Sequence, residues 1–80
     1  MPSSNWVTVI VHRHGELHSI GSPQDALLIL ISDWPNFEGI AYISALEACA
    51  GTEGGGVSFP EARAAFLLAA VEAGVYFQAA

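Results

Sequence analysis

Residues 6–20 read WVTVIVHRHGELHSI, a stretch that combines strand-forming residues with a central turn. Trp6 to His12 are almost all β-branched or aromatic, a composition typical of a β-strand. The next four residues, 13–16, include a glycine suited to a turn, and Leu17 to Ile20 return as a short second strand. The stretch therefore predicts a β-hairpin, with its loop length and register left open.

Side chains alternate between the two faces of a strand, so the first strand of the hairpin carries two sets. We expect Val7, Val9 and Val11 to share one face. The other face then receives Trp6, Thr8, Ile10 and His12.

A helix start follows the hairpin at residues 21–25, GSPQD. Ser22 can cap the helix, Pro23 fits its first position, and the acid three residues after Ser22 completes the capping pattern. Pro35 disfavours a helical conformation in the residue before it, so the helix is predicted to end at Asp33 or one residue later.

Leu28 and Ile29 depart from the apolar pattern of this helix. The face expected to pack on the core carries Ala26, Leu27, Leu30, Ile31 and Trp34. Leu28 and Ile29 fall on the opposite side, among polar residues. Two large aliphatic side chains on a polar face predict a second buried surface, so both residues are candidates for a partner surface.

A second helix is predicted from about Ile40 to Ala50. Its apolar stripe comprises Tyr42, Ala45, Leu46 and Cys49. Gly51 suits the position just past its last residue. Residues 52–57 contain three consecutive glycines and are predicted to form a flexible loop.

A third helix begins at Ser58, which repeats the capping pattern with Glu61. The apolar stripe of this helix consists mostly of small side chains, so this helix face is nearly flat. The stripe comprises Ala62, Ala65, Phe66, Ala69, Ala70 and Ala73. Gly74 ends this helix, and residues 75–77 are predicted to join the hairpin as a third strand. The predicted fold is therefore α+β in the order ββαααβ, with a three-stranded sheet packed against three helices.

Length and composition predict one domain with an apolar surface. We expect residues 1–80 to form a single α+β domain, with residues 1–5 as a loose N-terminal leader. Apolar residues make up 52% of the chain, and so small a domain has too little interior for all of them. Self-association is the simplest way to cover the remainder.

The charge balance restricts the partners. The chain has two arginines, no lysine and eight Asp and Glu residues, which give a formal net charge of −6. Binding to nucleic acid or to an anionic membrane needs several cationic side chains, so we expect neither. The single cysteine cannot form an internal disulfide, and no signal peptide or membrane-length apolar run is visible, so we expect a cytoplasmic protein.

A series of residues along the helices resembles a known family. The series comprises Ala26-Leu27, Trp34-Pro35, Gly39, Tyr42, Ala45, Cys49, Ala62-Arg63, Phe66, Ala69-Ala70 and Glu72-Ala73. In this ordered set the chain resembles a family of small proteins from rhizobia and related bacteria, domain of unknown function 982. The resemblance spans the chain from the hairpin to the final strand. It implies a compact α+β fold and carries over no catalytic residue, ligand or partner.

Three histidines of the hairpin are weak candidates for a metal site. His12 and His14 are two residues apart, and His18 could lie across the ladder, so three imidazoles could converge on zinc or nickel. The alternative is a polar hairpin tip in which the histidines do not converge. We favour this alternative and expect neither a metal nor another cofactor.

An aromatic cluster and one arginine are candidates for a ligand or partner surface. Trp34, Phe37 and Tyr42 surround the first helix–loop–helix junction, where they could form a pocket or close the end of the core. Arg63 could clamp an anionic ligand. Its structural alternative is an ion pair with Asp33, Glu38 or Glu61.

Support for catalysis is weak. Cys49 lies on an apolar stripe and is expected to be a buried, inert thiol. The serines lack a nucleophile motif, and the carboxylates are dispersed. Residues 54–58 precede a helix N-terminus but lack the spacing and lysine of a phosphate-binding loop.

The sequence thus favours a non-enzymatic protein-interaction module, a homodimer or an adaptor for another protein. The alternative is a binding domain for small anionic ligands that uses the aromatic cluster and Arg63. A metal-dependent enzyme built on the hairpin histidines is the third and weakest possibility.

Overall fold

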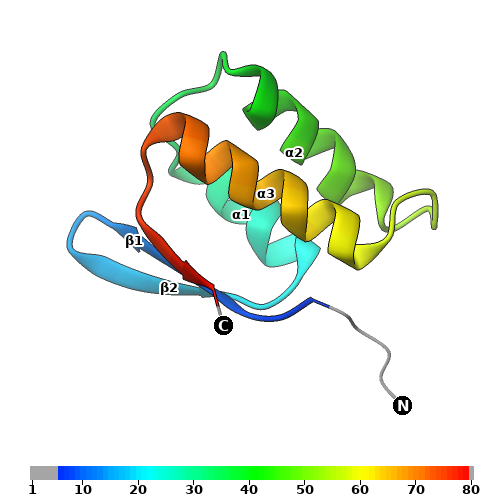
Figure 1. Cartoon of the computed structure of the whole chain (residues 1–80), viewed down its shortest axis with the longest axis horizontal. Helices are drawn as coiled ribbons and strands as arrows, with labels where there is room; N and C mark the ends of the chain where they lie inside the picture. The colour runs from blue at the N-terminus through cyan, green and yellow to red at the C-terminus, as the bar shows by residue number, and fades with distance from the viewer. Residues whose placement is uncertain (1–5, 80) are drawn as a thin grey trace.

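The computed structural model describes residues 6–79, so the predicted leader at residues 1–5 lies outside the described residues. The elements are β1 (Val9–Arg13), β2 (Glu16–Ile20), α1 (Pro23–Ser32), α2 (Ile40–Gly51), α3 (Phe59–Ala73) and β3 (Phe77–Ala79) (Figure 1). The predicted α+β fold in the order ββαααβ is confirmed.

The three strands form an antiparallel sheet in the order β2-β1-β3. In the hairpin, Arg13 pairs with Glu16 across the two-residue loop His14-Gly15. Both loop residues have positive φ, 53° and 76°. Such a turn matches the right-handed twist of the strands and fixes the register that the sequence left open.

The N-terminal end of the first strand differs from the prediction. β1 begins at Val9 rather than Trp6, so strand alternation does not extend back to Trp6 and Val7. Trp6 is buried and donates from its indole Nε1 to the carbonyl oxygen of Ile20 at 2.9 Å, whereas Val7 is 48% exposed. Val9 and Val11 are buried as expected.

The last strand also starts later than predicted, at Phe77. Gly74 adopts the left-handed conformation that ends α3, with φ of 72°. The N–H of Val75 then donates to the carbonyl of Ala70, so Val75 belongs to the helix cap. The first link from this segment to the sheet is the carbonyl of Tyr76, which accepts from the N–H of His12.

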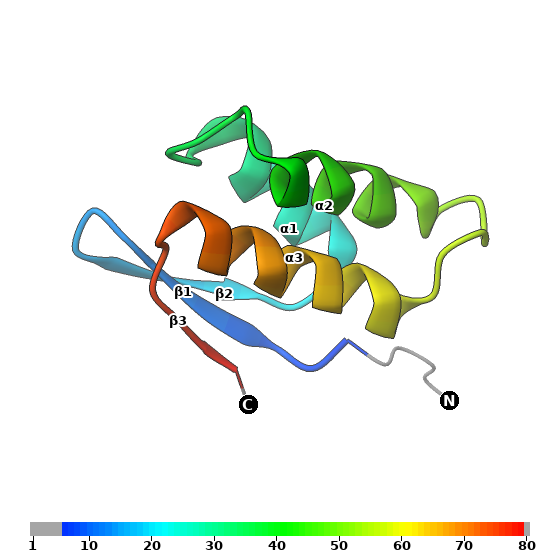
Figure 2. The same cartoon turned by 45° about the horizontal axis from the view of Figure 1, so that its top comes forward.

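α1 and α3 lie between the sheet and α2, which packs along both helices on the side away from the strands (Figure 2). Phe66 of α3 is fully buried at the centre of this arrangement. The ring centroids of Trp34 and Trp6 lie 5.6 Å and 6.2 Å from that of Phe66. These aromatic contacts join the segment before β1 and the end of α1 to α3.

The predicted helix starts are confirmed. Ser22 accepts from the N–H of Asp25, and Ser58 and Glu61 form a reciprocal capping box. At the end of α2 the prediction was wrong, because Gly51 is the last helical residue and Thr52 caps the helix. The space around Gly51 gives the reason for a glycine within the helix: a Cβ there would lie 2.7 Å from Cγ2 of Val57.

Candidate functional site

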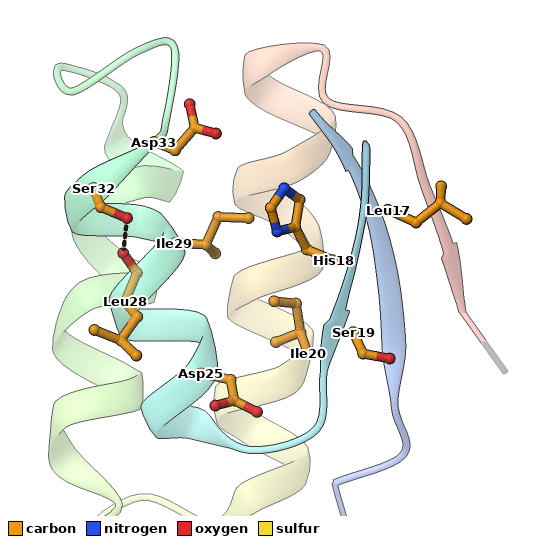
Figure 3. A pocket seen from close by; sticks show the side chains of 9 residues that line it. All are labelled: Leu17, His18, Ser19, Ile20, Asp25, Leu28, Ile29, Ser32 and Asp33. Atoms are coloured by element: carbon orange, nitrogen blue, oxygen red, sulfur yellow. Dashed lines mark hydrogen bonds between the residues drawn. The ribbon is translucent and has the colours of Figure 1, made fainter. Parts of the chain in front are cut away.

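A groove of about 380 Å³ runs between β2 and α1 (Figure 3). Residues 17–20 of β2 line one wall. The other wall comes from α1 and the residue after it, chiefly Leu28, Ile29 and Asp33. Because β2 is an outer strand of the sheet, the groove lies beside an open sheet edge.

Asp33 closes one end of this groove with a small charge network. Its Oδ1 accepts from Nε2 of His14 at 2.9 Å and from Nη2 of Arg13 at 3.3 Å. The hydrogen bond with His14 is the main cause of a lowered pKa at Asp33, and Arg13 acts in the same direction. Partial desolvation opposes them. The hairpin turn is therefore tied to the end of α1.

The structure does not bring the three hairpin histidines together. His18 pairs with Val11 and shares its helix-facing side, whereas His12 pairs with Leu17 on the outer face of the sheet. The ring of His12 packs edge-on against Tyr76, with centroids 4.6 Å apart. His14 contacts Asp33. Within residues 6–79, no group of three His, Cys, Asp or Glu side chains is placed to hold a metal ion.

Two residues of β2 direct their backbone N–H and C=O groups toward the open edge. The N–H of His12 donates to Tyr76 on the β3 side, so the backbone groups of His12 point away from β2. Inward and outward groups alternate along an antiparallel strand. The residues opposite His12 and Ile10, which are Leu17 and Ser19, therefore direct their N–H and C=O groups outward from the sheet.

Leu28 and Ile29, the candidates from the polar face of α1, have different environments. Leu28 is 67% exposed at the mouth of the groove, whereas Ile29 is only 6% exposed. Ile29 is thus buried on the side of α1 where a second buried surface was predicted, but β2 of the same chain covers it rather than a partner. Ile31, expected in the core, is instead 66% exposed.

The aromatic candidates split between core and surface. Trp34 and Tyr42 are 3% and 6% exposed, and the Tyr42 hydroxyl donates to the carbonyl oxygen of Leu30 at 2.8 Å. Phe37 is 57% exposed and packs edge-on against Tyr42, with ring centroids 5.5 Å apart. Of these three, only Phe37 presents a surface to a partner.

Arg63 lies near the start of α3, away from Tyr42, which contacts the end of that helix. Its Nε donates to the carbonyl of Val7 at 2.8 Å, so it fastens the segment before β1 to α3. None of the expected ion pairs, with Asp33, Glu38 or Glu61, is found for Arg63 among the described residues. Tyr42 contacts α3 near Glu72, nine residues further along, which corresponds to about 14 Å of helix.

The remaining candidates are structural. Cys49 is fully buried on α2, and burial raises the pKa of its thiol to about 11. The glycine loop at residues 54–56 is exposed, and only Gly55 has positive φ there. In the part of the chain that the structure describes, none of the helices combines the length and apolar content needed to cross a membrane.

The sequence interpretation missed the groove and the open edge. The hairpin was predicted, but which of its two strands ends up outermost depends on where β3 pairs. One signal was present: Leu28 stands apart from the apolar stripe of α1, and it marks the mouth of the groove.

One comparison with known proteins gives a match. The sequence model of a family described as "Protein of unknown function (DUF982)" matches residues 5–77, nearly the whole chain. Searches of curated proteins and of solved structures each found no match. The chain therefore belongs to the DUF982 family of proteins of unknown function.

Proposed function

We propose that this protein is a non-enzymatic interaction module that associates with itself. The observation that carries the proposal is a pair of exposed apolar side chains, three residues apart, on each helix. The pairs are Leu28 and Ile31 on α1, Ile40 and Ile43 on α2, and Leu68 and Val71 on α3, with exposed fractions from 47% to 82%.

Residues three apart on a helix lie next to each other on its surface, so each pair forms one apolar patch. Scattered apolar side chains are normal on a protein surface. Adjacent pairs on every helix of one small domain are a stronger sign of an interface, because covering them removes apolar area from water. The same excess of apolar residues is present in the composition.

Charge determines how such an association responds to salt. Two copies with a formal charge of −6 each repel one another. Salt screens this repulsion over a Debye length of about 10 Å at 0.1 M. The proposed association therefore tightens as salt is added, as expected of an interface held by apolar contacts and backbone hydrogen bonds.

Sedimentation velocity over a micromolar concentration series, at low and moderate salt, tests the proposal. We expect a concentration-dependent shift from monomer to dimer that occurs at lower protein concentration in the higher salt. A single monomeric species throughout the series would contradict self-association.

The alternative, a binding domain for small anionic ligands, has less support. Tyr42 contacts the end of α3, whereas Arg63 lies near its start. Trp34, which packs on Phe66 between them, is buried, so little supports one pocket that joins the aromatic cluster and Arg63. The groove beside β2 carries the carboxyl groups of Asp25 and Asp33, which repel an anion. We further propose a cytoplasmic location, which the single, buried and unpaired Cys49 supports.

A further inference from the structure

We propose that the open edge of β2 pairs antiparallel with β2 of a second copy, with Leu17 opposite its own counterpart on the twofold axis. This inference rests on the proposed self-association and names the surface that performs it. The pairing extends the three-stranded sheet across the dimer into one of six strands.

The edge is equipped for such pairing. Leu17 and Ser19 direct their N–H and C=O groups away from β1, so they offer donors and acceptors to an added strand. Natural proteins often protect an open edge with lysine, proline or a bulge. The chain contains no lysine, and β2, whose sequence is ELHSI, has no proline.

Complementary side chains across the proposed ladder select the second copy as the occupant. In a twofold ladder with Leu17 facing Leu17, Glu16 of each copy lies opposite His18 of the other. Both side chains project to the same side of β2, and Nε2 of His18 lies 3.9 Å from Oε1 of Glu16 within one copy. In this register the pairs of Glu16 and His18 are of the non-hydrogen-bonded type, in which side chains lie close together. The imidazole of His18 is therefore placed to donate a hydrogen bond to the Glu16 carboxylate of the other copy.

The other twofold registers lack this match. If Leu17 faces Ser19, the two copies of His18 oppose each other and Glu16 faces Ile20. If Ser19 faces Ser19, His18 faces Ile20. Only the register centred on Leu17 sets both ionisable side chains of β2 against a partner of the other type.

The groove lies beside the edge at which the second strand is proposed to pair. Glu16 and His18 of the second copy project to the helix-facing side of the extended sheet, where the groove opens (Figure 3). Leu28 lies at the mouth of this groove and is 67% exposed. Leu28 is one of the apolar side chains that motivate self-association, and it lines the groove beside the proposed interface.

A backbone test comes from Leu17→Pro. The N–H of Leu17 points outward, so its removal leaves the bonds between β1 and β2 intact and blocks the added strand. We expect the dimer dissociation constant to rise at least about tenfold, because an edge proline cannot donate to the new ladder. Leu17→Thr, which keeps the N–H, is the matched control and retains the dimer.

A charge-reversal series tests the register without changing the backbone. His18→Glu sets a second carboxylate opposite Glu16 twice per dimer, so we expect dimerisation to weaken by about tenfold. Glu16→Lys together with His18→Glu restores opposite charges and dimerisation. The control for net repulsion between copies is Ala64→Glu. It lies on the exposed side of α3, away from the edge, and adds one negative charge, as His18→Glu does when His18 is neutral.

Sedimentation equilibrium of each variant, with circular dichroism to verify folding, separates the outcomes. If folded Leu17→Pro still dimerises as the wild type does, the edge assignment is wrong and self-association stands. The same holds if His18→Glu weakens dimerisation no more than Ala64→Glu does. A double variant that does not recover overturns the register. A wild-type chain that stays monomeric at every concentration contradicts self-association itself.

Discussion

The carboxyl group of Glu72 occupies the space in which a Cβ at Gly39 would lie. Its two oxygens accept from the backbone N–H groups of Ala41 and Tyr42, each at 3.2 Å. Gly39 is the N-cap residue of α2 and has no side chain to perform this role. A residue near the end of α3 therefore caps the start of α2, and the glycine makes room for it.

Replacement of Glu72 by alanine tests this cap. We expect Glu72→Ala to lower the free energy of unfolding by about 1 kcal/mol, because two N–H groups at the start of α2 lose their acceptor. Urea denaturation followed by circular dichroism measures the change. Glu53→Ala, in the exposed turn after α2, is the matched carboxylate deletion and is expected to have a smaller effect.

A double-mutant cycle adds Gly39→Ala. Its Cβ displaces the Glu72 carboxylate in the wild-type chain, so it destabilises the protein more there than in the Glu72→Ala background. Equal effects in the two backgrounds would mean that Gly39 and Glu72 are not coupled.

The two glycines at the hairpin turn and at the end of α3 are expected to resist substitution. Gly15 and Gly74 have φ of 76° and 72°, and beyond their adjoining residues no atom lies within 4 Å of where a Cβ would stand, so backbone strain is what acts against alanine. We expect each alanine variant to lose about 1 kcal/mol of stability. Thermal unfolding provides the measurement. Gly56→Ala, equally open but without positive φ, serves as control and is expected to be neutral or stabilising.

Asp33 makes stability depend on acid pH. Its pKa is lowered below the ordinary value of 3.8, chiefly by the hydrogen bond with His14, so the folded chain binds its proton less readily than the unfolded chain does. The contribution of ionised Asp33 to the free energy of unfolding is therefore present above the pKa of the unfolded state. It is lost as pH falls through the pKa of the folded state. We expect the difference in stability between wild type and Asp33→Asn to be larger at about pH 5 than at about pH 2. A difference that is the same at both pH values would contradict this linkage.

Cys49 is expected to be inert in the folded protein. Full burial raises the pKa of the thiol to about 11, so little thiolate forms near neutral pH and reagents lack access. A thiol reagent such as Ellman's should label the native chain slowly and the urea-unfolded chain at once. Labelling should accelerate in Glu72→Ala, because destabilisation increases the population of opened molecules. Rapid labelling of the native wild type would show that Cys49 is accessible.

Local signals in the sequence were sufficient for much of the fold. The Ser22 cap, the capping box of Ser58 and Glu61, and the left-handed Gly74 were all predicted correctly. Each depends on groups within about four residues of one another, so the sequence window contains the whole interaction. The failures at the ends of the strands have the opposite cause. Trp6 does not follow the predicted strand alternation, because its indole hydrogen-bonds to the carbonyl oxygen of Ile20, fourteen residues away.

The candidate site was less accessible to sequence reasoning. Phe37 and Leu28 are exposed, but the sequence grouped them with Trp34, Tyr42 and Ile29, which are buried. Periodicity assigns a side chain to one face of its own helix and does not reveal which neighbour covers that face. Arg63 shows the same limit, since its partner is a backbone carbonyl that carries no sequence signal.

Alternation, periodicity and short-range hydrogen bonds were enough to specify the hairpin, the three helices, most of their caps and the ββαααβ order. The position of β1 at the centre of the sheet, and of β2 at its open edge, emerged only when the chain was folded. The same holds for the capping of α2 by Glu72, thirty-one residues beyond Ala41. Both features depend on pairing and packing between distant segments, which follow from how whole elements fit together and which no local pattern encodes.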